Sequence, residues 1–201
     1  MEDDLKPCEN SKRTLLVATI FLVMLEGIAW GDALMEFTPP PSYQAPPYTE
    51  PNIETPRSSL KLIDRNDGTI LDRKSGLLWA QKDSYADLQR CLTWPEALQY
   101  VKDLTTGGYS DWRMPSMREL LTIYDSSQEN VMAWDHNPEY PLALDTKFSD
   151  GAAYWYWSNE CGKTELTKHC AQTLYFVRGH NNLRHFDQCN NGGVRAVREM
   201  N

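Results

Sequence analysis

Beyond residue 60, apolar residues are spaced first as in strands, then as in helices, and then as in strands again. The first group of strand-like segments comprises residues 61–63, 69–71 and 77–80. Asn66-Asp67-Gly68 separates the first two segments and predicts a hairpin turn, because Asn and Gly tolerate positive φ. The second group lies towards the C-terminus and comprises residues 154–158, 173–178, 183–186 and 194–198. We therefore expect two groups of short strands.

Two helices are predicted between these groups, and each begins at a capping box. In the first box Glu96 follows Thr93 at the spacing that lets a hydroxyl and a carboxylate cap the first turn reciprocally. Ser116 and Glu119 repeat this spacing. The expected buried faces are Trp94, Ala97, Leu98, Val101 and Leu104 in the first helix and Met117, Leu120, Leu121 and Tyr124 in the second. Strands, two helices and further strands predict an α+β fold, a loop-rich domain with one core.

An uncharged apolar segment, residues 14–25, lies near the N-terminus. A helix that spans a bilayer needs about 20 apolar residues, so this shorter segment is typical of a signal peptide. Ala29 and Gly31 supply the small residues that precede a cleavage site. We expect residues 1–31 to be a signal peptide. The alternative is a short uncleaved anchor, which is the one membrane contact that we expect.

Residues 32–57 are rich in proline and poor in apolar side chains. Seven of the twelve prolines of the chain lie between residues 39 and 56. Proline favours extended polyproline structure and cannot donate backbone hydrogen bonds, so this segment predicts a semi-rigid tether. The compact domain is expected over residues 58–201.

The charge and the motif content exclude several classes of function. The formal net charge of −8 argues against a nucleic-acid partner, because nucleic-acid-binding domains are usually basic. The sequence has no nucleophile elbow, phosphate-binding glycine loop or metalloprotease motif. The spacing of Glu160, Glu165 and Asp187 does not select them as catalytic carboxylates. We expect a protein that is not an enzyme and has no cofactor.

The cysteines predict an oxidising compartment. Cleavage after residue 31 would remove Cys8 and leave Cys91, Cys161, Cys170 and Cys189. An even number of cysteines in a secreted chain predicts two disulfides, with three connectivities open. The alternative is zinc bound with His169, His180 or His185, but there is no C-x-x-C pair. The sequence favours disulfides, no metal, and a secreted or extracytoplasmic location in the periplasm or at the cell surface.

Six short strings occur in order between residues 60 and 199. They are DGT at 67–69, GLLW at 76–79, GGYSDWRMP at 107–115, EL at 119–120, YWS at 156–158 and VRAVR at 194–198. Together they resemble a bacterial family named for the C-terminal domain of Legionella collagen-like adhesin, the Lcl C-terminal domain family. The resemblance implies a C-type-lectin-like fold. In the founding adhesin this domain is linked to sulfated polysaccharides and to self-assembly.

The resemblance also bears on the disulfides. Relatives often have cysteines where this sequence has Val101 and Ala196, so the present cysteines must pair differently. The nested arrangement usual in C-type lectins implies two bridges, Cys161–Cys170 and Cys91–Cys189.

The C-terminal segment has a local positive charge. Four arginines, Arg178, Arg184, Arg195 and Arg198, stand against one aspartate, Asp187. Arg195 and Arg198 belong to the family string and have opposite strand parity, so we expect at least one of them to form an internal ion pair with Asp111 or Glu119. We assign structural roles to these two and to Arg113. Guanidinium groups match sulfate and carboxylate oxygens, which makes Arg178, Arg184 and His185 the candidate ligands of an anion.

A second candidate is the aromatic segment 154–157. Its alternation places Trp155 and Trp157 on one face of a strand and Tyr154 and Tyr156 on the other. A solvent-facing Trp155 and Trp157 would stack on sugar rings or form a subunit interface. The other interpretation is that one face belongs to the core and the loop at 125–150 covers the other.

These observations favour a non-enzymatic, extracytoplasmic binding module for a glycan, including an anionic one, or for a cell-surface partner. The alternative is a structural or assembly subunit of an envelope or surface complex, which forms homo-oligomers through its aromatic face. The predicted ligand residues are Trp155, Trp157, Arg178, Arg184 and His185.

Overall fold

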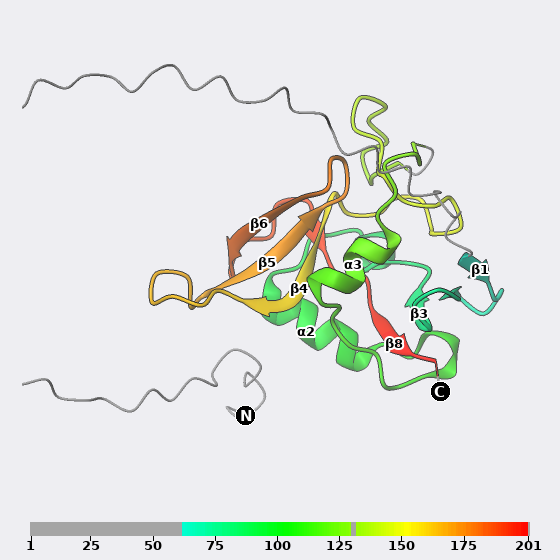
Figure 1. Cartoon of the computed structure of the whole chain (residues 1–201), viewed down its shortest axis with the longest axis horizontal. Coiled ribbons are helices and arrows are strands. Elements are labelled where there is room, and N and C mark those ends of the chain that lie inside the picture. The colour runs from blue at the N-terminus through cyan, green and yellow to red at the C-terminus, as the bar shows by residue number, and fades with distance from the viewer. Residues whose placement is uncertain (1–61, 130–131, 201) are drawn as a thin grey trace, which may run out of the picture. The chain divides into compact units, whose positions relative to one another are not determined.

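The computed structural model describes residues 62–129 and 132–200 (Figure 1). The predicted signal peptide and tether lie outside the described residues. The strands are β1 (Leu62–Asp64), β2 (Thr69–Asp72), β3 (Leu77–Ala80), β4 (Trp155–Cys161), β5 (Cys170–Tyr175), β6 (His180–His185), β7 (Gly192–Gly193) and β8 (Val197–Glu199). The helices are α1 (Ser84–Leu88), α2 (Trp94–Asp103), the short 3-10 helix η2 (Thr106–Gly108) and α3 (Met117–Ile123).

The strands form two sheets, with the orders β1-β2-β3-β8 and β6-β5-β4-β7. Figure 1 shows β4, β5 and β6 together on one side of the view and β1, β3 and β8 on the other. Neighbouring strands are antiparallel except for the short β4–β7 pair. Buried side chains from both sheets and from the helices join in one hydrophobic core. The predicted α+β fold is therefore confirmed, while the C-type-lectin-like assignment rests on the family resemblance.

The predicted hairpin is present between β1 and β2. Asn66 and Gly68 have φ values of 57° and 84°, the left-handed conformation that the turn requires. The predicted strand at 194–198 is divided differently. Residues 197–199 form β8 beside β3, and Gly192 and Gly193 form β7 beside β4.

Both predicted capping boxes are formed, and they fix the first residues of α2 and α3. In α3 the predicted apolar face is partly wrong, because Leu121 is 53% exposed and Ile123 is buried instead. Helix α1 was not predicted. It is a single turn of five residues, capped by the Asp83 carboxylate, and is too short for apolar periodicity to reveal it.

Three arginines hold the fold together through internal bonds, as expected. Arg195 is completely buried and donates to the backbone oxygens of Ala80 (3.0 Å) and Gln81 (2.6 Å) and to the Tyr156 hydroxyl (2.9 Å). Its guanidinium also lies 3.7 Å from the buried Asp83 carboxylate, a partner that was not predicted.

The other two arginines pair nearer the surface. Arg198 bonds the carboxylate of Asp111 at 2.6 Å and 3.0 Å, which was one of the two predicted partners. Arg113 bonds Glu119 at 2.6 Å and 2.9 Å. Two of the four arginines of the C-terminal segment, Arg195 and Arg198, are thus paired within the fold.

The predicted Cys91–Cys189 disulfide is present and joins the start of α2 to the loop before β7. The predicted Cys161–Cys170 bridge is wrong, because Cys170 has a free thiol. Cys161 lies opposite Ala171 in the β4–β5 ladder. Side chains alternate between the faces of a strand, so Cys170 points to the other face of the sheet.

Within the described ranges, no helix is long and apolar enough to cross a bilayer.

Candidate functional site

The aromatic segment at β4 is covered on both faces. Tyr156 and Trp157 are completely buried, and Tyr154 and Trp155 are 7% and 3% exposed. The Trp157 indole donates to the backbone oxygen of Leu92 at 2.9 Å inside the core. The prediction that Trp157 contacts a ligand is therefore wrong, and so is a subunit interface built on this aromatic face.

Trp155 is held beneath the surface in a fixed orientation. Its indole N–H donates to the backbone oxygen of Asn190 at 2.7 Å, and its ring packs edge-on against Trp157 at 5.0 Å between ring centroids. A Cβ at Gly192 would overlap the Trp155 ring, so glycine is required where β7 approaches β4.

A hollow of about 370 Å³ opens above Trp155. We call it the sheet hollow. Its walls come from the loop after α3, from strands β4, β5 and β6 with the residue before β4, and from the loop before β7. The lining residues are Asp135, Asn137, Tyr140, Tyr154, Trp155, Tyr175, Arg184, Asn190 and Asn191.

Arg184 lines this hollow, and its guanidinium bonds no acceptor in the part of the chain that the structure describes. Its guanidinium carbon is 4.2 Å from the centroid of the Trp155 ring, a stacked cation–π contact. Its Nε atom is buried and has no partner, and Arg184 forms no ion pair within residues 62–129 and 132–200. Burial lowers the pKa of Arg184, because desolvation disfavours its charged form. This arginine differs from Arg113, Arg195 and Arg198, which all bond carboxylates or carbonyls.

Other lining residues of the sheet hollow are rich in oxygen atoms. The Tyr154 hydroxyl donates to Asp135 at 2.6 Å, and the Tyr154 and Tyr175 rings lie 6.4 Å apart. Burial raises the pKa of Tyr154, and the bond to Asp135 and the charge of that carboxylate raise it further. Burial also raises the pKa of Tyr175, and the nearby Tyr140 raises it further. The cations Arg178 and Arg184 lower this pKa and so oppose the shift.

Of the five predicted ligand residues, the hollow brings Trp155 and Arg184 together. Arg178 is exposed in the turn between β5 and β6, near Tyr175 but outside the lining. His185 lies one position after Arg184 in β6, so its side chain points to the other face of the sheet, where it bonds Asp187 at 2.7 Å. The prediction that His185 joins Arg184 in one site is wrong.

Sequence reasoning missed Asp135, Asn137, Asn190 and Asn191. They lie in irregular loops, where no periodicity indicates which way a side chain points. The one usable signal was composition, because Asp135-His136-Asn137-Pro138 and Asn190-Asn191-Gly192 are turn-forming runs, and functional side chains are frequent on such loops.

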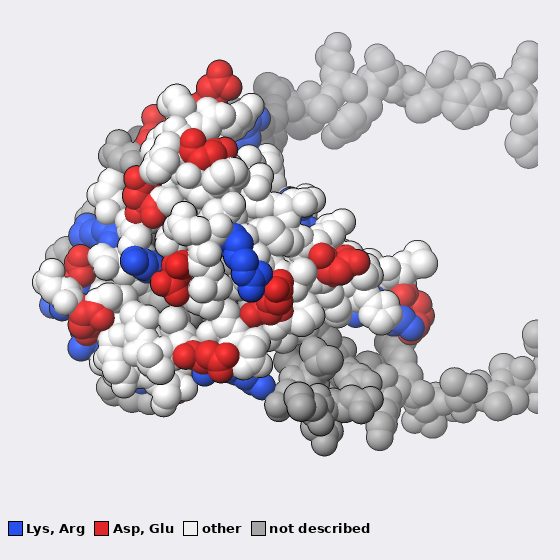
Figure 2. Space-filling model, turned by 180° about the vertical axis from the view of Figure 1, so that it is seen from behind, with Lys and Arg blue, Asp and Glu red and all other residues white. Residues whose placement is uncertain are grey.

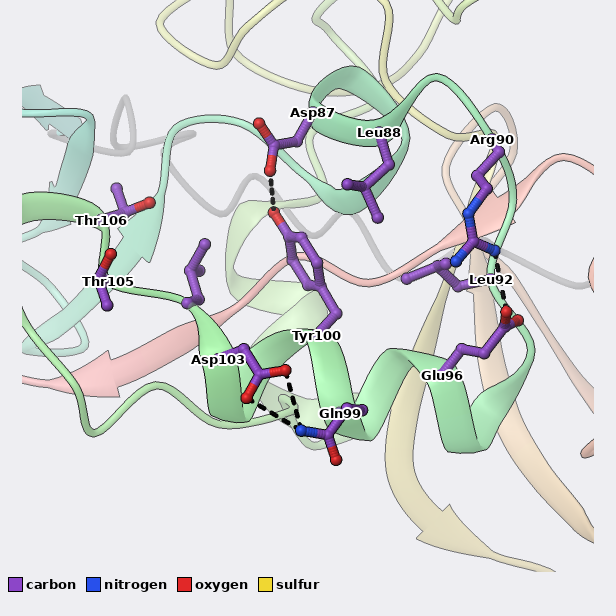
Figure 3. A pocket seen from close by; sticks show the side chains of 11 residues that line it. Asp87, Leu88, Arg90, Leu92, Glu96, Gln99, Tyr100, Asp103, Thr105 and Thr106 are labelled. Carbon is purple, nitrogen blue, oxygen red and sulfur yellow. Dashed lines mark hydrogen bonds and ion pairs between the residues drawn. The ribbon is translucent and has the colours of Figure 1, made fainter.

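A second, larger hollow of about 610 Å³ lies between α1 and α2, and we call it the helix groove. Figure 3 shows the Tyr100 side chain crossing it towards α1. Its polar groups bond one another. Tyr100 donates to Asp87 at 3.3 Å, Arg90 bonds Glu96 at 2.9 Å, and Gln99 bonds Asp103 at 2.9 Å. The helix groove thus offers few unpaired groups to a ligand.

The remaining surface gives no stronger candidate. Figure 2 shows acidic and basic side chains interspersed on the face that it presents, without a broad area of one sign. Among the described residues, no three His, Cys, Asp or Glu side chains gather as they would around a metal ion.

The comparisons with known proteins give one finding. The family model of the Lcl C-terminal domain matches residues 68–198, which contain the described strands except β1 and the last residue of β8. No curated protein matches the chain.

Proposed function

We propose that this chain, which belongs to the Lcl C-terminal domain family, is an extracytoplasmic, non-enzymatic module that binds an anionic glycan in the sheet hollow. The family and the predicted export signal support a role outside the cytoplasm. The Cys91–Cys189 disulfide supports it too, because disulfides persist in oxidising compartments.

The observation that carries the proposal is the unpaired Arg184 guanidinium. It is partly desolvated, stacked on Trp155 and part of the lining of a concave surface, and it bonds no acceptor among the described residues. A guanidinium fork of this kind matches the paired oxygens of sulfate or carboxylate, and partial burial strengthens the resulting charge-assisted bonds. The cation is also held in place before binding, which lowers the entropy cost of recognition.

The rest of the hollow suits the neutral part of a sugar. Tyr140 is 41% exposed and offers an aromatic face, on which the C–H side of a pyranose ring can pack. The amides of Asn137, Asn190 and Asn191 offer donors and acceptors for hydroxyl groups. A few placed polar groups among aromatic side chains are typical of small-molecule sites.

A sulfated-glycan array tests the proposal, with the bound amount followed as salt is raised. We expect salt-sensitive binding by the full chain, because screening weakens a contact between charges at a partly exposed site. Arg184→Gln should lower the affinity at least about tenfold, which corresponds to one charge-assisted hydrogen bond.

Two further variants calibrate this result. Arg178→Gln should have a smaller effect, because Arg178 is near Tyr175 but does not line the hollow. Arg118→Gln removes the same charge from an exposed position of α3 and should leave binding unchanged. Absence of salt-sensitive binding, or equal losses in all three variants, would refute the proposal.

A further inference from the structure

The sheet hollow contains two opposite charges that do not neutralise each other. Arg184 and Asp135 both line it. From this pairing we infer that the ligand is a saccharide unit carrying an ammonium group as well as an anionic group. The inference rests on the proposed function and adds the cationic half of the ligand.

Asp135 resembles Arg184 in having no partner of opposite charge. Its Oδ1 atom accepts bonds from the Tyr154 hydroxyl (2.6 Å) and from the Asn137 backbone N–H (3.2 Å). In the part of the chain that the structure describes, Asp135 forms no ion pair. Its side chain is exposed to solvent, so that a cation can reach it from the hollow. The carboxylate is thus oriented by neutral donors and has no cationic partner among the described residues.

The groups around Asp135 favour a cation with N–H donors. Tyr154, Tyr175 and Tyr140 lie close enough to influence one another's pKa, and their hydroxyl oxygens are acceptors as well as donors. Aromatic faces attract cations through the ring quadrupole. A protonated amine can therefore bond the carboxylate and phenol oxygens and contact an aromatic ring together.

The two charges are also separate from each other. Both residues line one hollow, but their side-chain N and O atoms do not approach within the 4.0 Å of an ion pair. The contrast with the helix groove is direct, because there Arg90 and Glu96 bond each other at 2.9 Å. Because neither charge has an ion-pair partner among the described residues, both are left to be satisfied by a ligand.

Electrostatics then discriminates among ligands. A ligand with only an anionic group gains from Arg184 but is repelled by Asp135, and a purely cationic ligand meets the reverse situation. A ligand with both groups gains at each end. The volume of about 370 Å³ is near the lower end of the usual range for small-molecule sites, which suits one sugar residue rather than an extended chain.

Four related sugars separate these cases: glucosamine 6-sulfate, N-acetylglucosamine 6-sulfate, glucosamine and N-acetylglucosamine. Acetylation removes the positive charge, and loss of the sulfate removes the negative charge. Calorimetric titration of the full chain at about pH 6 keeps the free amine protonated. We expect glucosamine 6-sulfate to bind at least about tenfold more tightly than either singly charged sugar, the gain of one further charge-assisted bond.

Two isosteric variants assign each end of the ligand to its residue. Asp135→Asn should abolish the preference for the amine over its acetylated form and leave the preference for sulfate. Arg184→Gln should abolish the preference for sulfate and leave the preference for the amine. Each variant retains one preference, which shows that it is folded. Glu139→Gln, an exposed change in the same loop, controls for net charge and should alter neither preference.

The outcomes separate this inference from the proposed function. Equal affinity for glucosamine 6-sulfate and its acetylated form, with no effect of Asp135→Asn, overturns the inference and leaves the anionic site standing. A failure of all four sugars and of the sulfated array to respond to Arg184→Gln overturns both. Crossed losses in the two variants support both.

Discussion

Arg195 and Arg184 come from the same C-terminal stretch of sequence but have opposite environments. Arg195 is fully buried, donates to two backbone oxygens and a phenol, and lies beside the Asp83 carboxylate. Arg184 stacks on Trp155 at the wall of a hollow and bonds no acceptor within residues 62–129 and 132–200. A buried charge needs partners to offset its desolvation, so a well-bonded arginine indicates a structural role. An arginine that has no partner and lines a concave surface indicates a ligand-binding role.

The largest effect on stability should come from replacing Arg195, the arginine with the structural role. Arg195→Met leaves the buried Asp83 carboxylate without its cation, and we expect a loss of about 3–5 kcal/mol in the free energy of unfolding. Urea denaturation measures it. Arg184→Met is the matched control and should lose less than about 1 kcal/mol. Equal losses would mean that the two arginines do not differ in role.

The second largest effect should come from removing the Cys91–Cys189 disulfide, which should change both the stability of the fold and sugar binding in the sheet hollow. The Cys91–Cys189 bridge spans 98 positions and anchors the loop that carries Asn190 and Asn191. Replacement of both cysteines by serine should lower the free energy of unfolding by about 2–4 kcal/mol and weaken sugar binding as well. Cys170→Ser, a change at a free thiol, is the control for loss of a sulfur. Full sugar affinity in the double variant would show that the loop does not depend on the bridge.

A smaller loss is expected from the packing under Arg184. Gly192→Ala forces a methyl group into the Trp155 ring, which should cost about 1–3 kcal/mol and displace the surface on which Arg184 stacks. Thermal unfolding and sugar titration measure the two effects. In a Trp155→Phe background the ring is smaller, so the same change should cost less. A cost that is independent of residue 155 would contradict this assignment.

The paired arginines also predict a pH dependence. Burial pushes the pKa of Glu119 up, but bonds from Arg113 and Ser116 outweigh it and hold the pKa below its usual value. A carboxyl with a lowered folded-state pKa stabilises the fold above its unfolded pKa of about 4.3, and this contribution disappears as the pH falls. Glu119→Gln should reduce the acid-induced loss of stability by up to about 1 kcal/mol, measured between about pH 6 and pH 3. An acid-induced loss of stability that is the same in wild type and Glu119→Gln would contradict this prediction.

The smallest effect on stability should come from replacing Arg184, the arginine without a bonded partner. Arg184→Gln should change the free energy of unfolding by no more than about 0.5 kcal/mol, because Arg184 bonds no acceptor that would be left unsatisfied. Chemical denaturation next to Arg118→Gln checks this. A loss above about 2 kcal/mol would show that Arg184 supports the fold. It would then contradict the argument that Arg184 is free to bind a ligand.

Much of the fold could be predicted from local signals in the sequence. The capping boxes at Thr93 and Ser116 place the starts of α2 and α3, since the residues that cap a helix lie within one turn of it. The hairpin turn at Asn66 is local in the same sense. The Asp83–Arg195 pair joins residues far apart in the chain, so no short-range pattern reports it.

The candidate site was harder to predict, for two physical reasons. Alternation along β4 indicates which aromatic residues share a face but not what covers that face, so the burial of Trp157 could not be inferred. The residues that give the hollow its second charge and its amides, such as Asp135 and Asn190, lie in loops whose conformation depends on tertiary contacts. The resemblance to a family supplied the Cys91–Cys189 pairing, but the register of β4 and β5 decided against Cys161–Cys170.

The pairing of β8 with β3 has a consequence for when the domain can fold. β3 comes early in the domain and β8 comes last, so the first sheet is completed only when the final strand arrives. The residues just before β8 include Arg195, whose guanidinium lies beside the Asp83 carboxylate. During synthesis from the N-terminus, β3 therefore keeps one unpaired edge until β8 has been made.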